Sequence, residues 1–254
     1  MQLYPDILNE FSTITLEKMD GVKLMDRTDT KFIFNKNILN QILIKLQNNY
    51  LVLEVNGCKV SRYESLYFDT INYDLYHKHQ NGKLNRFKVR FRKYVESNLH
   101  FFEIKFKNNK GRTVKNRVKQ MEINGEIKEK ALSLLAEKTP FASTDLEAKF
   151  WVNYSRITLV NKYTPERVTL DLNLHFKNNT QTKHIENIVI AEVKQEKVSN
   201  SFFVNLMKQL HIREGGISKY CLGVISLTQN IKHNNFKASI HFLNKINNVT
   251  STSA

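Results

Sequence analysis

Basic and apolar side chains alternate along residues 86–107, RFKVRFRKYVESNLHFFEIKFK, in a spacing that suits the binding of an anion. Successive side chains of an extended chain point to opposite faces, so the first half of the segment places these cations together: Arg86, Lys88, Arg90 and Arg92. After a polar link, the second half places these charged residues together: Glu103, Lys105 and Lys107. The pattern predicts an antiparallel hairpin with one charged surface and one apolar surface.

Such a row of like charges is unstable by itself. Neighbours on one face of a strand lie about 6.7 Å apart, and at an effective dielectric constant of about 20 two like charges at that distance repel by roughly 2.5 kcal/mol. The row must therefore be screened by water on a solvated outer face or neutralised by a bound anion. Guanidinium and ammonium groups are typical ligands of phosphate, so the second alternative predicts a phosphate site.

The same alternation recurs in other segments, where single carboxylates stand among the cations. One strand face in each of them would carry the charged residues Arg27, Asp29, Lys31, Lys115, Arg117, Arg156, Arg167, Asp171, Glu192 and Lys194. An expected last strand within GISKYCLGVIS adds Ser218 and Lys219. Cations mixed with sparse carboxylates favour a closed antiparallel barrel with a polar interior. Its basic lining would bind phosphates, and its carboxylates would hold a divalent cation that bridges them.

Helices must then cover the apolar outer faces of such a barrel. Apolar residues at helical spacing predict helices over residues 36–47, 126–138 and about 200–210, and Asn35 is a suitable N-cap for the first. We also expect residues 3–19 to form a short packing helix. Strands are expected around 50–55 and 59–68, and a short helix or turn over 71–80. The predicted fold class is α+β, an eight-stranded antiparallel β-barrel with a basic interior and flanking helices.

The composition is typical of one large domain that attracts polyanions. The 254 residues are 41% hydrophobic and include only three prolines and eight glycines, so we expect a single domain over residues 1–228 and a polar, partly helical tail over 229–254. The net charge of +15 attracts nucleic acid, anionic lipid or phosphorylated molecules.

The sequence also predicts a cytoplasmic protein without a membrane span. No apolar run approaches the length of such a span, and the N-terminus lacks the apolar core of a signal peptide. Cys58 and Cys221 lack the spacing of a zinc site. We expect both cysteines to be reduced core thiols.

An ordered set of short segments gives the chain a resemblance to a known family. The segments are RTDTKFIF, YFDT, KVRFRKY, FFEIKFK, GRTVKNR, YSR, RVTLDLNLHF, IAEVK and SKYCLG. With them the sequence resembles the VTC domain, the polyphosphate polymerase branch of the CYTH-like triphosphate tunnel metalloenzymes. The wider superfamily opens with alternating glutamates that end in a lysine, whereas this chain has RTDTK at residues 27–31. That departure favours the VTC branch over thiamine-triphosphatase and adenylate-cyclase relatives.

The resemblance implies an activity and roles for individual residues. In such a tunnel ATP and Mn²⁺ (or Mg²⁺) bind at one end, the terminal phosphate is transferred, and the polyphosphate chain leaves at the other. Phosphate transfer is assigned to Lys31, Arg90, Arg92, Lys105, Arg156, Arg167 and Lys219. Phosphate binding is assigned to Lys88, Lys107, Lys115, Arg117, Lys194 and Ser218, and metal binding to Glu192 and Glu103. No protein nucleophile is required, because phosphoryl transfer proceeds by positioning and electrostatic stabilisation.

Several alternatives stay open at the level of sequence. Glu103 and Asp171 are either metal ligands or salt-bridge partners that hold the arginines, and Lys88 and Lys107 either bind the chain or face solvent. A triphosphatase or short-chain polyphosphatase could use the same site, since water can replace the acceptor phosphate. A non-catalytic polyphosphate-binding module would keep the same basic residues. The oligomeric state is left open.

Nucleic acid is the least favoured of the polyanionic partners. Proteins that bind single strands stack bases on aromatic side chains beside the basic groups. In residues 86–107 the alternation puts the aromatic residues Phe87, Phe91, Phe102 and Phe106 on the face opposite to the arginines. We therefore expect ATP or another triphosphate, and polyphosphate, as the ligands.

Overall fold

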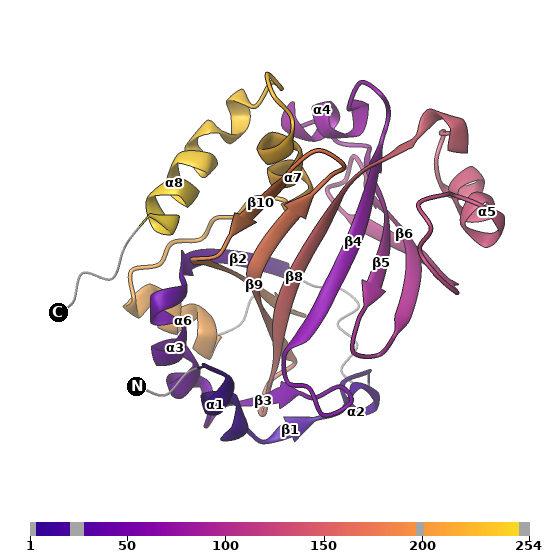
Figure 1. Ribbon diagram of the computed structural model, residues 1–254. Helices are drawn as coiled ribbons and strands as arrows, with labels where there is room; N and C mark the ends of the chain where they lie inside the picture. Colours follow the sequence, from indigo (N-terminus) through magenta and orange to yellow (C-terminus); the bar gives the residue numbers. More distant parts are fainter. Residues whose placement is uncertain (1–3, 21–27, 197–200, 249–254) are drawn as a thin grey trace.

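The computed structural model describes residues 4–20, 28–196 and 201–248 and combines one large sheet with surrounding helices (Figure 1). The strands are β1 (Thr13–Ile14), β2 (Thr28–Asn35), β3 (Tyr50–Leu53), β4 (Ser61–Asp69), β5 (Arg86–Tyr94), β6 (Leu99–Lys107), β7 (Thr113–Gln120), β8 (Glu147–Asn161), β9 (Glu166–Lys177), β10 (Thr182–Ile185) and β11 (Ile188–Gln195). The helices are α1 (Tyr4–Asn9), α2 (Leu16–Asp20), α3 (Leu39–Leu46), α4 (Asp74–Gln80), α5 (Glu129–Lys138), α6 (Phe202–Gln209), α7 (Lys219–Leu227) and α8 (Lys237–Asn247). Short 3₁₀ turns are η1 (Lys36–Ile38), η2 (Ser143–Asp145) and η3 (Asn234–Phe236). The predicted α+β class and large antiparallel sheet are confirmed.

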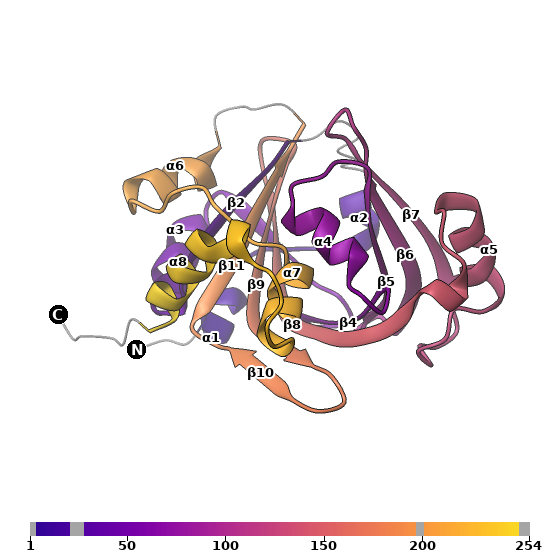
Figure 2. The same ribbon diagram turned by 90° about the horizontal axis from the view of Figure 1, so that it is seen from above.

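Eight strands form the main path of the sheet, in the order β2-β11-β9-β8-β4-β5-β6-β7. Every neighbouring pair along this path is antiparallel. The path curves, so that its edge strands β2 and β7 lie on opposite sides of the view in Figure 2. Within the described residues β2 and β7 do not pair with each other, so the expected barrel is not closed by strand pairing.

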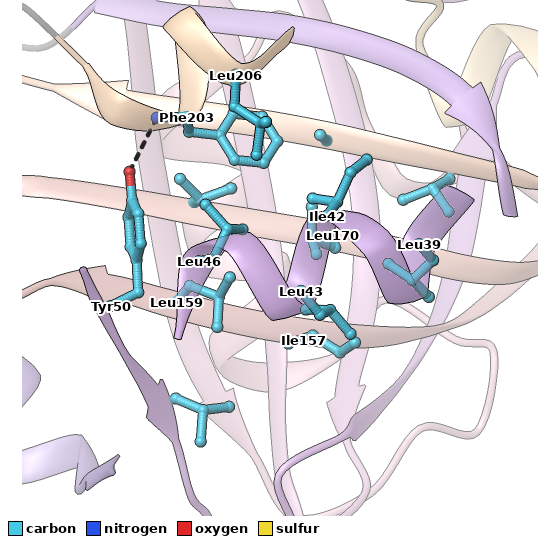
Figure 3. Close-up of a cluster of buried hydrophobic side chains, with 14 of the residues drawn as sticks. Leu39, Ile42, Leu43, Leu46, Tyr50, Ile157, Leu159, Leu170, Phe203 and Leu206 are labelled. Atoms are coloured by element: carbon cyan, nitrogen blue, oxygen red, sulfur yellow. Dashed lines mark hydrogen bonds between the residues drawn. The ribbon is translucent and has the colours of Figure 1, made fainter. Parts of the chain in front are cut away.

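Helix α3 covers the apolar face of the half-sheet that contains β8, β9 and β11. The side chain of Asn35 accepts a hydrogen bond from the N–H of Asn37 and begins the turn η1 that leads into α3. The apolar side chains of α3 pack on the strands and on α6 (Figure 3). The buried residues of this contact are Leu39, Ile42, Leu43, Leu46, Ile157, Leu159, Leu170, Phe203 and Leu206. Burial of each such leucine or isoleucine side chain stabilises the fold by about 1.5–3 kcal/mol relative to an exposed side chain. The predicted helix cover is confirmed here.

Helix α5 covers the apolar face of the other half-sheet. Ala131 and Leu135 of α5 are fully buried and pack against strand residues of the hairpin: Val89, Phe91, Phe102 and Ile104. The apolar side of the predicted hairpin therefore faces a helix, and its charged side faces the opposite way. This arrangement positions the basic residues on the inner face of the curved sheet, and helix α7 covers part of that face.

The segment GISKYCLGVIS forms helix α7, so the predicted last strand is wrong. The side chain of Ser218 caps the helix by accepting the N–H of Cys221. Gly223 allows a very close approach to the sheet, because a Cβ there would lie 2.3 Å from Cε2 of Phe150 and 2.9 Å from Cδ1 of Phe176. Helix α7 is buried on nearly every side. Its sequence therefore lacks the spacing of apolar and polar residues that distinguishes a helix from a strand.

The two ends of the chain also differ from the expectation in detail. Residues 3–19 do not form one helix, because α1 ends at Asn9 and is followed by β1 and α2. The helix expected in the tail is α8, and the side chain of Asn35 donates to the carbonyl of Ile246 at 2.7 Å.

Cys58 is exposed rather than a core thiol, whereas Cys221 is buried, and both are free. In the part of the chain that the structure describes, no helix is both long and apolar enough to cross a membrane.

Candidate functional site

One face of the main sheet carries the predicted site residues, and we call it the cationic face. The strand register pairs Lys31 with Glu192, Arg156 with Asp171, and Arg90 with Glu103. The cationic face comprises Asp29, Lys31, Lys88, Arg90, Arg92, Glu103, Lys105, Lys107, Lys115, Arg117, Arg156, Arg167, Asp171, Glu192 and Lys194, with Ser218 and Lys219 from the start of α7. Arg27, which was expected beside Asp29, lies outside the described residues.

Glu103 is fully buried between two cations. Its Oε2 accepts the Nε of Arg90 at 2.9 Å and the Nη2 at 2.6 Å, and its Oε1 forms an ion pair with Lys115 of β7. Burial alone would raise the pKa of Glu103, but the positive charges of Arg90, Arg92 and Lys115 outweigh burial and hold the pKa well below its usual range. The carboxylate is therefore ionised and joins three neighbouring strands.

Asp171 holds a second pair of cations in the same way. It accepts a bidentate contact from Arg156, with Nε–Oδ1 at 2.5 Å and Nη2–Oδ2 at 2.8 Å, and an ion pair from Lys219 at the first turn of α7. Burial would raise the pKa of Asp171, but the charges of Arg156 and Lys219 lower it. This carboxylate fixes α7 to the cationic face.

Glu192 forms the third cluster, at the β2–β11 edge of the sheet. Its Oε1 lies 3.0 Å from Nζ of Lys31 and 2.9 Å from Nζ of Lys194, and Lys194 also lies 3.1 Å from Oδ2 of Asp29. Burial would raise the pKa of Glu192, but the two lysines lower it far below its usual range. Lys194 therefore bridges two carboxylates that are themselves on neighbouring strands.

Tyrosine rings connect these clusters across the middle of the sheet. The guanidinium carbon of Arg156 lies 4.9 Å from the ring centroid of Tyr63, and that of Arg92 lies 5.5 Å from the same ring. Tyr63 stacks on Tyr154 at 5.1 Å, and Nζ of Lys219 lies 4.8 Å from the Tyr154 ring. The rings thus hold arginines by cation–π contacts.

These tyrosines correct one part of the argument against nucleic acid. The phenylalanines Phe91 and Phe102 do lie in the apolar core, as predicted. Tyr63 and Tyr154, however, share the face of the arginines. Their rings are already occupied by guanidinium groups.

Some cations on the face have no carboxylate partner among the described residues. Arg92 is 8% exposed and donates from Nε to Oγ of Ser65 at 3.1 Å, and Lys88 donates to Oγ of Ser218 at 2.8 Å. Lys105 is half-buried and forms no ion pair within the described part of the chain. Burial, followed by the charges of Arg90, Arg92 and Lys115, lowers the pKa of Lys105 well below its usual value. The face therefore carries uncompensated positive charge around Lys105.

The remaining predicted residues lie toward the edges of the cationic face. Arg117 is exposed on β7, and its guanidinium carbon lies 4.5 Å from the Phe101 ring centroid. Lys107 is half-buried at the end of β6. Nη1 of Arg167 lies 4.0 Å from Sδ of Met19 in α2. These three cations surround the clustered centre rather than joining it.

The carboxylates fit a divalent cation unequally. No group of three His, Cys, Asp or Glu side chains within the described ranges could hold a metal alone. Both oxygens of Glu103 are held by cations, which does not fit a metal ligand. In Glu192 the ion pairs with Lys31 and Lys194 are formed by Oε1. Lys194 also contacts Asp29, so the two carboxylates lie on either side of one ammonium group. Because Mg²⁺-like ions use one or two carboxylates with substrate phosphates and water, Glu192 and Asp29 fit such a site.

Several supporting residues were not predicted from the sequence. The hydroxyl of Tyr67 accepts Nη1 of Arg90 at 2.6 Å. The carboxylate of Asp69 is fully buried, accepts the N–H groups of Leu75 and Tyr76 at the start of α4 and is hydrogen-bonded by the hydroxyl of Tyr220 in α7. The alternation of β4 puts Tyr67 on the same face as Ser65, but only the register with β5 shows which arginine it meets.

Comparisons with known proteins agree with this arrangement. Residues 26–228 match the family model described as the VTC domain. A candidate adenylyl cyclase from Hippeastrum, which has a dominant triphosphatase activity, is 14% identical with a TM-score of 0.53, over 82% of this chain and 100% of its own. It therefore shares the fold.

Two further candidate adenylate cyclases are more distant. The protein from Vibrio parahaemolyticus is 12% identical with a TM-score of 0.46, over 78% of this chain and 99% of its own. The protein from Bacillus halodurans is 13% identical with a TM-score of 0.46, over 81% and 100%. A search of curated proteins found no match.

Proposed function

The chain belongs to the VTC domain family, and from this premise we propose that it transfers the γ-phosphate of ATP to a growing polyphosphate chain on the cationic face. One observation supports the proposal above the others: the cations of this face outnumber its carboxylates, and Arg92 and Lys105 have no carboxylate partner in the described structure. The excess is greater than the charge of one triphosphate. A longer polyanion would neutralise it.

In the proposed reaction the protein acts by positioning and charge. Arginine guanidinium groups bind phosphate oxygens in bidentate fashion, and lysines act as point charges. Arg90 and Arg156 are already oriented by Glu103 and Asp171, so little reorganisation is needed when phosphate arrives. Lys31 and Lys219 would bind the phosphate from two sides, since one lies on β2 and the other on α7. The acceptor is the terminal phosphate oxygen of the chain.

Glu192 and Asp29 would hold a divalent cation, Mn²⁺ or Mg²⁺, together with phosphate oxygens. When bound, such an ion neutralises charge on the transferring phosphoryl group. Lys31 and Lys194 contact Oε1 of Glu192, and in the proposed reaction their ammonium groups would bind phosphate oxygens instead. The same residues therefore serve the ion and the substrate.

The proposal includes a closed tunnel and a cytoplasmic location, where ATP is available. The edge strands β2 and β7 carry Lys31 and Lys115 on the cationic face. Closure between these two edges would surround an extended polyphosphate with basic groups on all sides. The exposed cations of β7 would then face those of β2 across the chain.

Turnover assays test the proposal directly. Purified protein is incubated with ATP and Mn²⁺, and ADP, inorganic phosphate and polyphosphate are measured together. We expect ADP to be matched by polyphosphate, with loss of both products in Glu192→Gln and Arg90→Ala. Arg62→Ala is the matched control, because Arg62 lies on β4 but is exposed and forms its ion pair with Glu96.

Two outcomes would overturn the proposal. ADP matched by free phosphate would identify a triphosphatase, in which water replaces the acceptor. Tight polyphosphate binding without any ADP would identify a module that only binds.

A further inference from the structure

The chain between α6 and α7 lies along the outer edge of β2. Glu214 forms an antiparallel bridge with Phe32, and the N–H of Gly215 donates to the carbonyl of Lys31 at 2.9 Å. Residues 214–216 thus follow the strand edge that is not paired with β11. They run directly into Ser218 and Lys219 at the start of α7.

Gly216 lies against the side chain of Lys31. A Cβ at residue 216 would be 3.0 Å from Cδ of Lys31, 3.1 Å from its Cβ and 3.7 Å from its Cγ. The first two distances are tighter than ordinary van der Waals contact. Gly216 is not among the glycines with a positive φ, so the missing side chain, and not an unusual backbone, is what this position requires.

The contact involves the aliphatic stem of Lys31, whose conformation sets the position of the ammonium group. A lysine has a flexible four-carbon stem, and the side chain of Lys31 is 40% exposed. Its Nζ nevertheless lies 3.0 Å from Oε1 of Glu192. Packing of the stem against Gly216 restricts the side chain on the side away from β11.

We propose that Gly216 is a positioning residue whose bare backbone holds the Lys31 stem and directs its ammonium group onto the cationic face. The role of Lys31 as a phosphate ligand rests on the proposed function, whereas the contact with Gly216 does not. Because only two residues separate Gly216 from Lys219, the same segment sets the two lysines at a fixed relation.

The test compares Gly216→Ala with Gly215→Ala. A Cβ at Gly215 would meet nothing within 4 Å, and it too has no positive φ, so the two variants differ mainly in the contact with Lys31. The first readout is the rate at which an amine-reactive reagent labels Lys31, measured by peptide mass spectrometry. We expect Gly216→Ala to change this rate severalfold and Gly215→Ala to leave it unchanged.

The second readout is the affinity for inorganic tripolyphosphate. We expect Gly216→Ala to weaken it about tenfold, as for the loss of one charge-assisted hydrogen bond, and Gly215→Ala to change it less than twofold. In a Lys31→Ala background, Gly216→Ala should have no further effect on the affinity. Equal labelling of Lys31 in wild type and Gly216→Ala overturns the inference. A further loss of affinity in the Lys31→Ala background does the same.

The outcomes separate this inference from the proposed function. If the wild type does not bind tripolyphosphate, the proposed function fails, while the labelling of Lys31 still decides the role of Gly216. If Gly216→Ala melts at a much lower temperature than Gly215→Ala and the difference persists in the Lys31→Ala background, the glycine serves general packing, and the inference fails.

Discussion

Removal of the charge of Glu103 should lower stability and strengthen anion binding at the same time. At the 2.6 Å that separates Arg90 from Glu103, the attraction is roughly 6 kcal/mol at an effective dielectric constant of about 20. Desolvation offsets part of it, and the loss of one partner from a buried pair costs about 3–5 kcal/mol. In Glu103→Gln, Arg90 keeps its charge inside the protein without a counter-charge, and the more exposed Lys115 loses its partner.

Thermal unfolding measures both effects. For a chain of this size 1 kcal/mol shifts the melting temperature by about 2–4 °C, so Glu103→Gln should melt about 6–20 °C below the wild type. Tripolyphosphate supplies negative charge to the freed cations, and it should raise the melting temperature of the variant more than that of the wild type. The control is Glu126→Gln, whose partner Lys128 is exposed. An exposed pair contributes at most about 1 kcal/mol.

Two results would refute this reasoning. A shift below 2 °C in Glu103→Gln would mean that the carboxylate is not part of a buried ion pair. A smaller ligand-induced rise in the variant than in the wild type would mean that Glu103 is needed for binding, as it would be if it were a metal ligand.

Three further predictions follow from the charges and the packing. Lys105→Met removes a cation without a carboxylate partner among the described residues, so the variant should melt about 2–4 °C above the wild type, the equivalent of about 1 kcal/mol. Its affinity for polyphosphate, measured in a titration, should fall. An unchanged affinity would contradict the role of Lys105 in phosphate binding. Burial lowers the pKa values of Lys88, Lys105 and Lys115, and phosphate binds the charged form of lysine. As the pH is raised, polyphosphate affinity should therefore start to fall before the pH reaches 10.5, the ordinary pKa of lysine. Binding measured at several pH values checks this. Gly223→Ala places a Cβ against Phe150 and should cost about 1–3 kcal/mol of stability in a denaturant titration, with Ser226→Ala on the same helix as the control.

Alternation in the sequence was sufficient to predict most of the sheet. Period-two patterns identified the strands that became β5, β6, β7, β8, β9 and β11, because each has one apolar face covered by helices and one polar face. The pattern failed at α7, where apolar residues on all sides conceal the helical period. The cap at Ser218 and the preceding glycine pair were the local signals of a helix start.

The composition of the cationic face could be predicted, but its pairing could not. The sequence places Arg90 and Glu103 on charged faces, yet only the register of β5 with β6 brings them together. The contact of Asp171 with Lys219 depends on α7, which the sequence suggested as a strand. Long-range contacts of this kind are set by packing, and no local spacing encodes them.

Each buried or half-buried carboxylate of the cationic face contacts two basic side chains: Glu103, Asp171 and Glu192. A face built in this way is an ion exchanger that carries its own counter-ions. Under the proposed function, an arriving phosphate would displace a carboxylate from each paired cation, and the carboxylate would return when the phosphate leaves. Arg92 and Lys105, which lack such a partner within the described residues, would meet the phosphate directly. This exchange would keep each phosphate only moderately bound, so that the polyphosphate of the proposed reaction could advance from one cation to the next.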